Sequence, residues 1–322
     1  MRQSGALLAC FLWGAGWTLV EAADPRYEVQ LKRAFMERYK DRTSIDAAMV
    51  IRHSHTAANK VGKGSDDGDL HFSGESKDVG LPFVAEVVNA SQEQPAVDLI
   101  RAAAKDKQDH PSAQTVTRVY GAWRLWFEHP STSQIQGASN PFHPDTTNPD
   151  HSFEIHPIAK VGEIDLHRSF FTVKDFKANP PKDFVAYDAA KAFSYFDGKS
   201  ITIKASSSGV ALRSQKLVYN YVQFVIQVSK KPLKVSDGYL VLAQVLDEEG
   251  EPQSSSERRM VFVEGTDPAR SIGAAQAGDR FHVLGVPRID LSAVSALVKK
   301  NGTKMFQAAL PYEMIIVGIY SQ

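Results

Sequence analysis

Two acid–histidine pairs are the residues of this chain whose types and spacing point most directly to chemistry. Asp69 and His71 lie two residues apart, and so do Glu154 and His156. Side chains at positions i and i+2 point to the same face of a β-strand, so each pair shares a face if its segment is extended. The two pairs would converge if both strands lay in one small barrel or sheet. We therefore expect a shared wall that carries two carboxylates and two imidazoles.

These residue types are suited to binding a divalent metal ion. Imidazole and carboxylate are ligands that zinc, manganese or iron accepts where thiolate is absent. The candidate set comprises three metal ligands and two carboxylates for activating a bound water: Asp69, His71 and His156 as ligands, and Glu86 and Glu154 as the catalytic groups. The alternative is that Asp67-Gly68 is a hairpin turn and that both histidines are core groups held by hydrogen bonds to the acids. The sequence leaves both interpretations open.

A third candidate is an aromatic segment over residues 121–129, which alternates large side chains on both faces of a predicted strand. Arg124 and Trp126 offer a guanidinium and an aromatic ring of the kind that small β-barrels use to stack bases or sugars. We assign them as candidate ligand-binding residues. The alternative is burial, because aromatic side chains on strands usually belong to the core.

The elements that must position these residues are mostly strands. Alternating apolar residues and turn signals predict five strands and one helix between residues 44 and 170. The strands are expected at 44–55, 69–73, 83–89, 116–128 and 152–166, and the helix at 95–105. A helix between the third and fourth of five strands is typical of the OB fold, a small barrel. The fold class predicted is mainly β with minor α, an OB-like barrel followed by a second β-rich domain.

The Gly68-Asp69-Leu70-His71 and Glu154-Ile155-His156-Pro157 strands resemble those of small secreted bacterial proteins with an OB-like domain. The resemblance covers residues 45–166. It implies the fold and carries over no activity.

The domain organisation follows from composition and turn signals. We expect a signal peptide at 1–22, an N-terminal helix at 23–43, the OB-like domain at 44–170, a proline-containing linker at 171–184 and the second β-rich domain at 185–322. Six or seven strands and one or two helices in the last region would form another barrel or a half-open sandwich. No Asp-x-His pair recurs there, so the sequence does not indicate a duplicate.

Residues 1–22 predict export, because one basic residue precedes an apolar run from Gly5 to Val20 and small residues follow it. Cleavage after Ala22 would remove Cys10, the one cysteine, and leave no disulfide or thiol chemistry. A lipoprotein site at Cys10 is the weaker alternative. No later apolar run is long enough to span a bilayer. The expected location is the periplasm of a bacterium or its extracellular medium.

Function stays open between classes. The leading prediction is an exported ligand-binding module for a saccharide, peptide or oligonucleotide from the envelope or medium. Nucleic acid is the weakest of these ligands, because basic and acidic residues number 37 each and phosphate binding needs a basic excess. The alternative is a metal-dependent hydrolase acting on phosphodiesters or another exported substrate. A third interpretation is a structural envelope protein without a small ligand.

Overall fold

A computed structural model describes residues 24–64, 66–138, 143–172, 185–247, 249–254 and 257–319. The chain is mainly β, as predicted, and contains two small closed barrels and a third, open sheet. The expected signal peptide and residues 173–184 of the expected linker lie outside the described residues. Within the described ranges, no helix combines the length and apolar character needed to span a membrane.

The first barrel is formed by the predicted strands. It comprises β2 (Ser44–Ser54), β3 (Leu70–Glu75), β4 (Phe83–Val87), β5 (Thr117–Leu125) and β7 (Phe153–Val161), with helix α2 (Gln94–Asp109) between β4 and β5. The strands pair in the order β4-β3-β2-β5-β7, and a parallel pairing of β4 with β7 closes the barrel. This is the OB-like arrangement. Pro95 in the first turn of α2 and its buried residues Val97 and Ile100 explain why that segment is a helix packed on the barrel.

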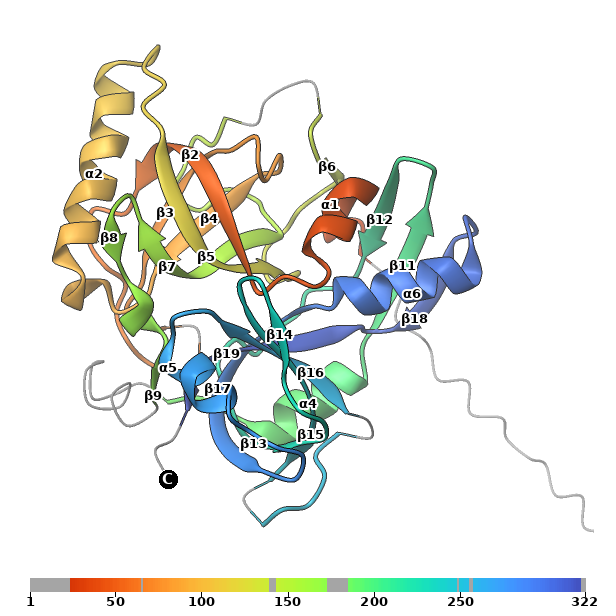
Figure 1. Ribbon diagram of the computed structural model, residues 1–322. Helices are drawn as coiled ribbons and strands as arrows, with labels where there is room; N and C mark the ends of the chain where they lie inside the picture. The colour runs from red at the N-terminus through yellow and green to blue at the C-terminus, as the bar shows by residue number, and fades with distance from the viewer. Residues whose placement is uncertain are drawn as a thin grey trace, which may run out of the picture.

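The second barrel has the same strand order. It comprises β13 (Val222–Val228), β15 (Gly238–Leu246), β16 (Arg258–Val263), β17 (Arg280–Ile289) and β19 (Tyr312–Ile319), with helix α5 (Asp267–Ile272) between β16 and β17. Its first strand pairs with its second and fourth, and its third pairs in parallel with its fifth, as in the first barrel. Figure 1 shows this barrel below the first one. The second region is thus a closed barrel rather than a half-open sandwich.

The third sheet joins segments that are far apart in the sequence. Its order is β18 (Phe306–Ala309), β11 (Ser200–Ala205), β12 (Gly209–Arg213), β1 (Glu28–Lys32) and β6 (Gln134–Ile135). In Figure 1, β11, β12 and β18 lie beside the barrels, together with helix α6 (Leu291–Asn301). The sheet therefore draws strands from both expected domains.

The helix predicted over residues 23–43 is wrong for its first half. Residues 28–32 form β1, and only α1 (Arg33–Tyr39) is helical in this segment. Val29 and Leu31 are fully buried and alternate with more exposed neighbours, which is the period of a strand. Pairing with β12 and β6 on both sides satisfies the backbone of β1.

The remaining elements are short, apart from α4. They are β8 (Ile164–Asp165), β9 (Phe171–Thr172), β10 (Tyr187–Asp188), β14 (Leu233–Val235), α4 (Ala189–Asp197), η1 (Ala90–Gln92) and η2 (His167–Ser169).

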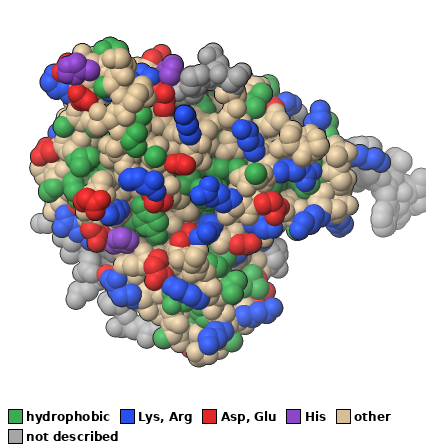
Figure 2. Space-filling model, turned by 45° about the horizontal axis from the view of Figure 1, so that its top comes forward, with side chains coloured by type: hydrophobic (Ala, Val, Ile, Leu, Met, Phe, Trp, Pro, Cys, Tyr) green, Lys and Arg blue, Asp and Glu red, His purple; other side chains and the backbone are tan. Residues whose placement is uncertain are grey.

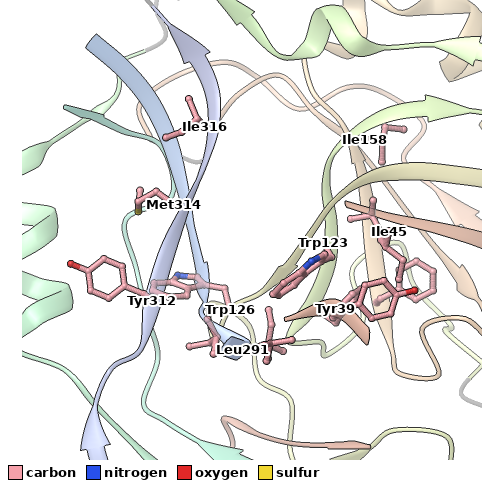
Figure 3. Close-up of a cluster of buried hydrophobic side chains, with 14 of the residues drawn as sticks. Tyr39, Ile45, Trp123, Trp126, Ile158, Leu291, Tyr312, Met314 and Ile316 are labelled. Carbon is pink, nitrogen blue, oxygen red and sulfur yellow. The ribbon is translucent and has the colours of Figure 1, made fainter. Parts of the chain in front are cut away.

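The hydrophobic core is continuous between the two barrels. Figure 3 shows Trp123 and Trp126 of the first barrel in one cluster with Tyr312 and Met314 of the second. Both tryptophans are buried. The core therefore fixes the barrels relative to one another, and it encloses the strand that carries Arg124.

Two buried arginines fasten the barrels together reciprocally. Arg124 Nε donates to the carbonyl oxygen of Pro287 at 3.1 Å, and Arg288 Nη1 donates to the carbonyl oxygen of Trp123 at 2.9 Å. Each guanidinium thus binds the carbonyl of the residue that precedes the other arginine. The Arg288 guanidinium also lies 3.5 Å from the centre of the Trp123 ring, a cation–π contact.

Candidate metal centre

Three strands of the first barrel bring the predicted residues together. His71 on β3 lies directly opposite Glu86 on β4 in the antiparallel pairing. The parallel pairing of β4 with β7 sets Val84 beside Glu154, so Glu86 and His156, each two residues further on, are also neighbours. Glu86 therefore lies between the two imidazoles. The prediction that both imidazoles share one wall is confirmed.

The first group of potential ligands is Asp69, His71 and Glu86. His71 Nε2 contacts Asp69 Oδ2 and lies 3.4 Å from Glu86 Oε1. One ligand atom from each residue lies within 4.8 Å of the others. Because ligand atoms of one ion with bonds of about 2.1 Å stand at most about 4.2 Å apart, small side-chain adjustments would close this group on an ion.

The second group is Asp67, Glu86 and His156, and it meets the same distance criterion. His156 Nδ1 contacts Glu86 Oε2, and His156 Nε2 lies 3.7 Å from Asp67 Oδ2. The two groups share Glu86, which turns one carboxylate oxygen to each imidazole. Such a shared carboxylate can bridge two neighbouring cations.

Asp67 was missing from the sequence prediction, which placed it in a turn. It lies two residues before Asp69, but Gly68 between them has a φ angle of +73° and β3 begins at Leu70, so strand alternation does not extend to Asp67. The spacing Asp67, Asp69, His71 was the signal available in the sequence. Asp67 Oδ1 and His71 Nδ1 are buried and have no hydrogen-bond partner in the described part of the chain. Buried polar atoms are usually hydrogen-bonded, so each exception needs an explanation, such as a bound ion.

Glu154, predicted as a catalytic group, is held by Arg124 and His151. Its Oε2 contacts Arg124 Nη1, and its Oε1 lies 3.3 Å from His151 Nε2. Burial opposes ionisation, but Arg124 and His151 hold the pKa of Glu154 well below its usual value. A carboxylate held in this way is a poor base for activating water, because it has little affinity for a proton. Glu154 also lies 3.7 Å from His156 Nδ1, so it borders the centre.

Arg124 and Trp126 do not present a recognition surface, because each is only 1% exposed. Arg124 points into the protein and binds Glu154, Glu128 and the carbonyl oxygen of Pro287. Trp126 packs edge-on against Phe196 of α4, from beyond the first barrel. This long-range packing removes both candidate anchors from solvent.

Tyr221 belongs to the centre and could not be found from the sequence, because it comes from the second half of the chain. Its hydroxyl lies 2.7 Å from His156 Nε2 and donates a hydrogen bond to Asp67 Oδ2. Burial and the neighbouring Asp67 raise the pKa of Tyr221 well above its ordinary value, so the phenol keeps its proton.

Protons balance the acids of the centre when no cation does. Burial disfavours charged imidazoles, yet Glu86 and Asp69 raise the pKa of His71 to about 10. Burial has the same effect at His156, where Glu86 and Asp67 nevertheless raise the pKa to about 9. Burial and the nearby Asp69 raise the pKa of Asp67 well above its usual value. A divalent cation could replace these protons, since ligands release protons when metal binds.

His71 is the most exposed side chain of the centre. Its side chain is 15% exposed, whereas those of Asp69, Glu86 and His156 are at most 7% exposed. The His55 ring stacks on His71 at 5.0 Å and is half-buried. A small molecule would therefore reach the centre past these two rings.

Two more histidines border the centre behind Glu154. His129 and His151 stack with ring centres 4.6 Å apart and planes 19° apart. The in-plane lone pairs of such rings run side by side instead of converging on one point. His151 Nδ1 also lies 2.6 Å from the carbonyl oxygen of Pro149. We therefore assign His151 to the surrounding shell that orients Glu154, with His129 stacked on it.

Comparisons with known proteins assign this chain to no family. No protein-family model and no curated protein matches the chain. A solved structure described as "Structure of murine DNA binding protein bound with ds DNA" aligns at 10% sequence identity over 85% of this chain and 98% of that one, with a TM-score of 0.18. A likeness at that TM-score supports no conclusion about fold or ligand.

Proposed function

We propose that the chain is an exported, metal-dependent hydrolase whose centre lies in the first barrel. The observation that carries the proposal is Glu86, which faces His71 with one carboxylate oxygen and His156 with the other. Together with Asp67 and Asp69 it provides two ligand groups that share one member. Two ions about 3.5–4 Å apart are a common arrangement in phosphoester hydrolases.

The proposal assigns a role to each residue. Asp67, Glu86 and His156 would hold an inner ion, and Asp69, His71 and Glu86 an outer one. The outer ion would carry the reacting water, because His71 is the member of the centre that solvent reaches. A bound cation lowers the pKa of that water and polarises the substrate oxygen.

The substrate class we propose is a small phosphodiester. The centre is largely buried and His71 is its most exposed side chain, which suits a small ester better than a long polymer. Basic and acidic side chains are interspersed over the face drawn in Figure 2, in keeping with the equal numbers of both in the sequence.

The proposed export to the periplasm or medium rests on residues 1–22 alone.

Metal content tests the proposal first. The purified protein is loaded with Mn²⁺ or Zn²⁺, dialysed and analysed for bound metal. We expect one or two ions per chain and a large loss in the Glu86→Gln variant. Glu163→Gln is the matched control, because that side chain is 96% exposed and lies away from the centre.

Hydrolysis of bis(p-nitrophenyl) phosphate by the loaded protein is the second measurement. Absence of bound metal, or bound metal without hydrolysis of phosphodiesters, would contradict the proposed function.

A second candidate function is ligand binding at a groove on the outside of the same barrel. The groove holds about 840 Å³ and is lined by β2 and by the turn between β3 and β4, including Ala48, Val50 and Leu81. OB-like barrels bind ligands on this kind of strand face. Its apolar lining favours peptides or neutral saccharides. A thermal-shift screen with short peptides and oligosaccharides, repeated with Val50→Trp to fill the groove, tests this candidate.

A further inference from the structure

Tyr221 links the second barrel to the centre in the first. It immediately precedes β13 and is only 1% exposed. Its ring centre lies 5.7 Å from that of His156. The backbone around it is held from two sides, because Tyr187 N donates to the Tyr221 carbonyl oxygen at 2.7 Å and β13 begins at the next residue.

The backbone before Tyr221 adopts a conformation that few aromatic residues have. Tyr219 has a φ angle of +67°, in the left-handed region. Such a residue is disfavoured by roughly 1–3 kcal/mol unless its surroundings fix it, and such strain clusters near functional sites. The rings of Tyr187 and Tyr195 pack against Tyr219 at 5.0 and 5.2 Å. These contacts fix the turn that directs Tyr221 toward the first barrel.

The hydrogen bonds of Tyr221 determine which nitrogen of His156 is free. The phenol has one proton, and it donates that proton to Asp67 Oδ2. Its oxygen must then accept from His156 Nε2, which lies 2.7 Å away. The proton of a neutral His156 is thereby placed on Nε2, and the lone pair on Nδ1. Nδ1 is the nitrogen that faces Glu86 and Glu154.

We propose that Tyr221 is a positioning residue of the metal centre, so that the second barrel controls how tightly the first barrel binds divalent ions. The inference rests on the proposed function, because it assigns a role toward the same ions. Groups that orient a metal-bound histidine through its second nitrogen affect metal affinity by about 10–100-fold. Tyr221 orients His156 in this way and steadies Asp67 at the same time.

The test compares Tyr221→Phe with Tyr219→Phe in the full-length protein. Both variants lose one phenol oxygen, but only Tyr221 contacts the centre. Affinity for Zn²⁺ is measured by competition with a chromophoric chelator, and the d–d absorption bands are recorded after loading with Co²⁺. We expect Tyr221→Phe to bind Zn²⁺ about 10–100-fold more weakly and to shift the Co²⁺ bands, while Tyr219→Phe behaves as wild type.

The outcomes separate this inference from the function on which it rests. If the wild type binds neither Zn²⁺ nor Co²⁺, the proposed metal function fails and the inference fails with it. If the wild type binds both ions but Tyr221→Phe has the same affinity and spectrum, only the inference is overturned. Weaker binding with unchanged Co²⁺ bands, or equal losses in both variants, would also overturn it, because a general loss of packing explains those results.

Discussion

The two barrels share one strand order, and each has a buried arginine–glutamate pair between its fourth and fifth strands. Arg124 is paired with Glu154 in the first barrel, and Arg288 with Glu313 in the second. The residue two positions after the glutamate is His156 in the first barrel and Ile315 in the second. His156 belongs to the candidate metal centre, whereas Ile315 belongs to a hydrophobic cluster.

The surroundings of the two pairs differ in the groups that face the carboxylates. In the second barrel, Glu313 receives hydrogen bonds from both Arg259 and Arg288, and Asp290 also binds Arg259. Two cations therefore meet these two anions in the interior, and Arg259 also reaches the exposed Asp41 at 3.2 Å. In the first barrel, Arg124 is the one arginine among the described residues that ion-pairs with Glu154, beside a group of carboxylates that also includes Asp67, Asp69 and Glu86. The same topology thus holds carboxylates paired with arginines in the second barrel, whereas in the first barrel Asp69 and Glu86 face imidazoles instead.

The largest expected effect on stability comes from removing the charge of Glu313 in the second barrel. Glu313→Gln leaves the buried Arg288 and Arg259 without their shared anion. Breaking a buried ion pair costs about 3–5 kcal/mol, because an uncompensated charge stays in the interior. We expect that loss in the free energy of unfolding measured with urea, against a change within about 0.5 kcal/mol for Glu163→Gln. A loss below 1 kcal/mol would mean that the ion cluster is not structural.

A smaller effect is expected from pH at Asp290. Burial and the neighbouring Glu313 raise the pKa of Asp290 to about 6 from an ordinary 3.8, although Arg259 opposes the shift. A carboxyl whose folded pKa is raised contributes stability that is fully present below pH 3.8 and is lost as the pH rises through about 6. Asp290→Asn lacks this titration. Relative to that variant, the wild type should lose about 2 kcal/mol of unfolding free energy between pH 4 and pH 7.

Paired urea titrations of wild type and Asp290→Asn at pH 4, 5, 6 and 7 measure this difference. Asparagine can still accept the hydrogen bonds from Ser292 N and Ala293 N that cap α6. A constant gap across the range, or a gap that changes with the opposite sign, would contradict the prediction.

The smallest effect on stability is expected in the first barrel, at Asp67. Burial keeps the pKa of this carboxyl high, and its Oδ1 has no hydrogen-bond partner among the described residues. Asp67→Asn replaces a carboxyl whose charged form is disfavoured by burial with a neutral group of nearly the same shape, so the metal-free protein should lose less than about 1 kcal/mol. Zn²⁺ affinity should nevertheless fall at least tenfold, because an anionic ligand is lost. Equal costs for Asp67→Asn and Glu313→Gln in chelator-treated protein would remove the contrast between the barrels.

Local patterns were enough to predict the first barrel but not the assembly around it. The strands and the helix of that barrel follow from alternating apolar residues and from Pro95. The closure of the second barrel depends on the parallel pairing of β16 with β19, which lies in no local pattern. Val29 and Leu31 carry a period-two signal, but the residues around them also match a helical period, so a helix was predicted there. Residues 28–32 form a strand because they pair with β12 and β6, which are distant in sequence.

The candidate centre shows the same division. Asp69, His71, Glu86 and His156 converge because alternation along a strand fixes the face of each side chain. Tyr221 required knowledge of how the two barrels pack. Burial of Arg124 and Trp126 likewise arises from α4 and the second barrel.

The reciprocal bonds between the arginines and the opposite backbones make the two barrels one thermodynamic unit. Arg124 needs the Pro287 carbonyl, and Arg288 needs the Trp123 carbonyl. Melting either half would strip the other of a partner for a buried cation, which is among the costliest losses a protein interior can suffer. Calorimetry should accordingly register a single heat-absorption peak for both halves, and neither half should survive proteolytic separation as a folded fragment.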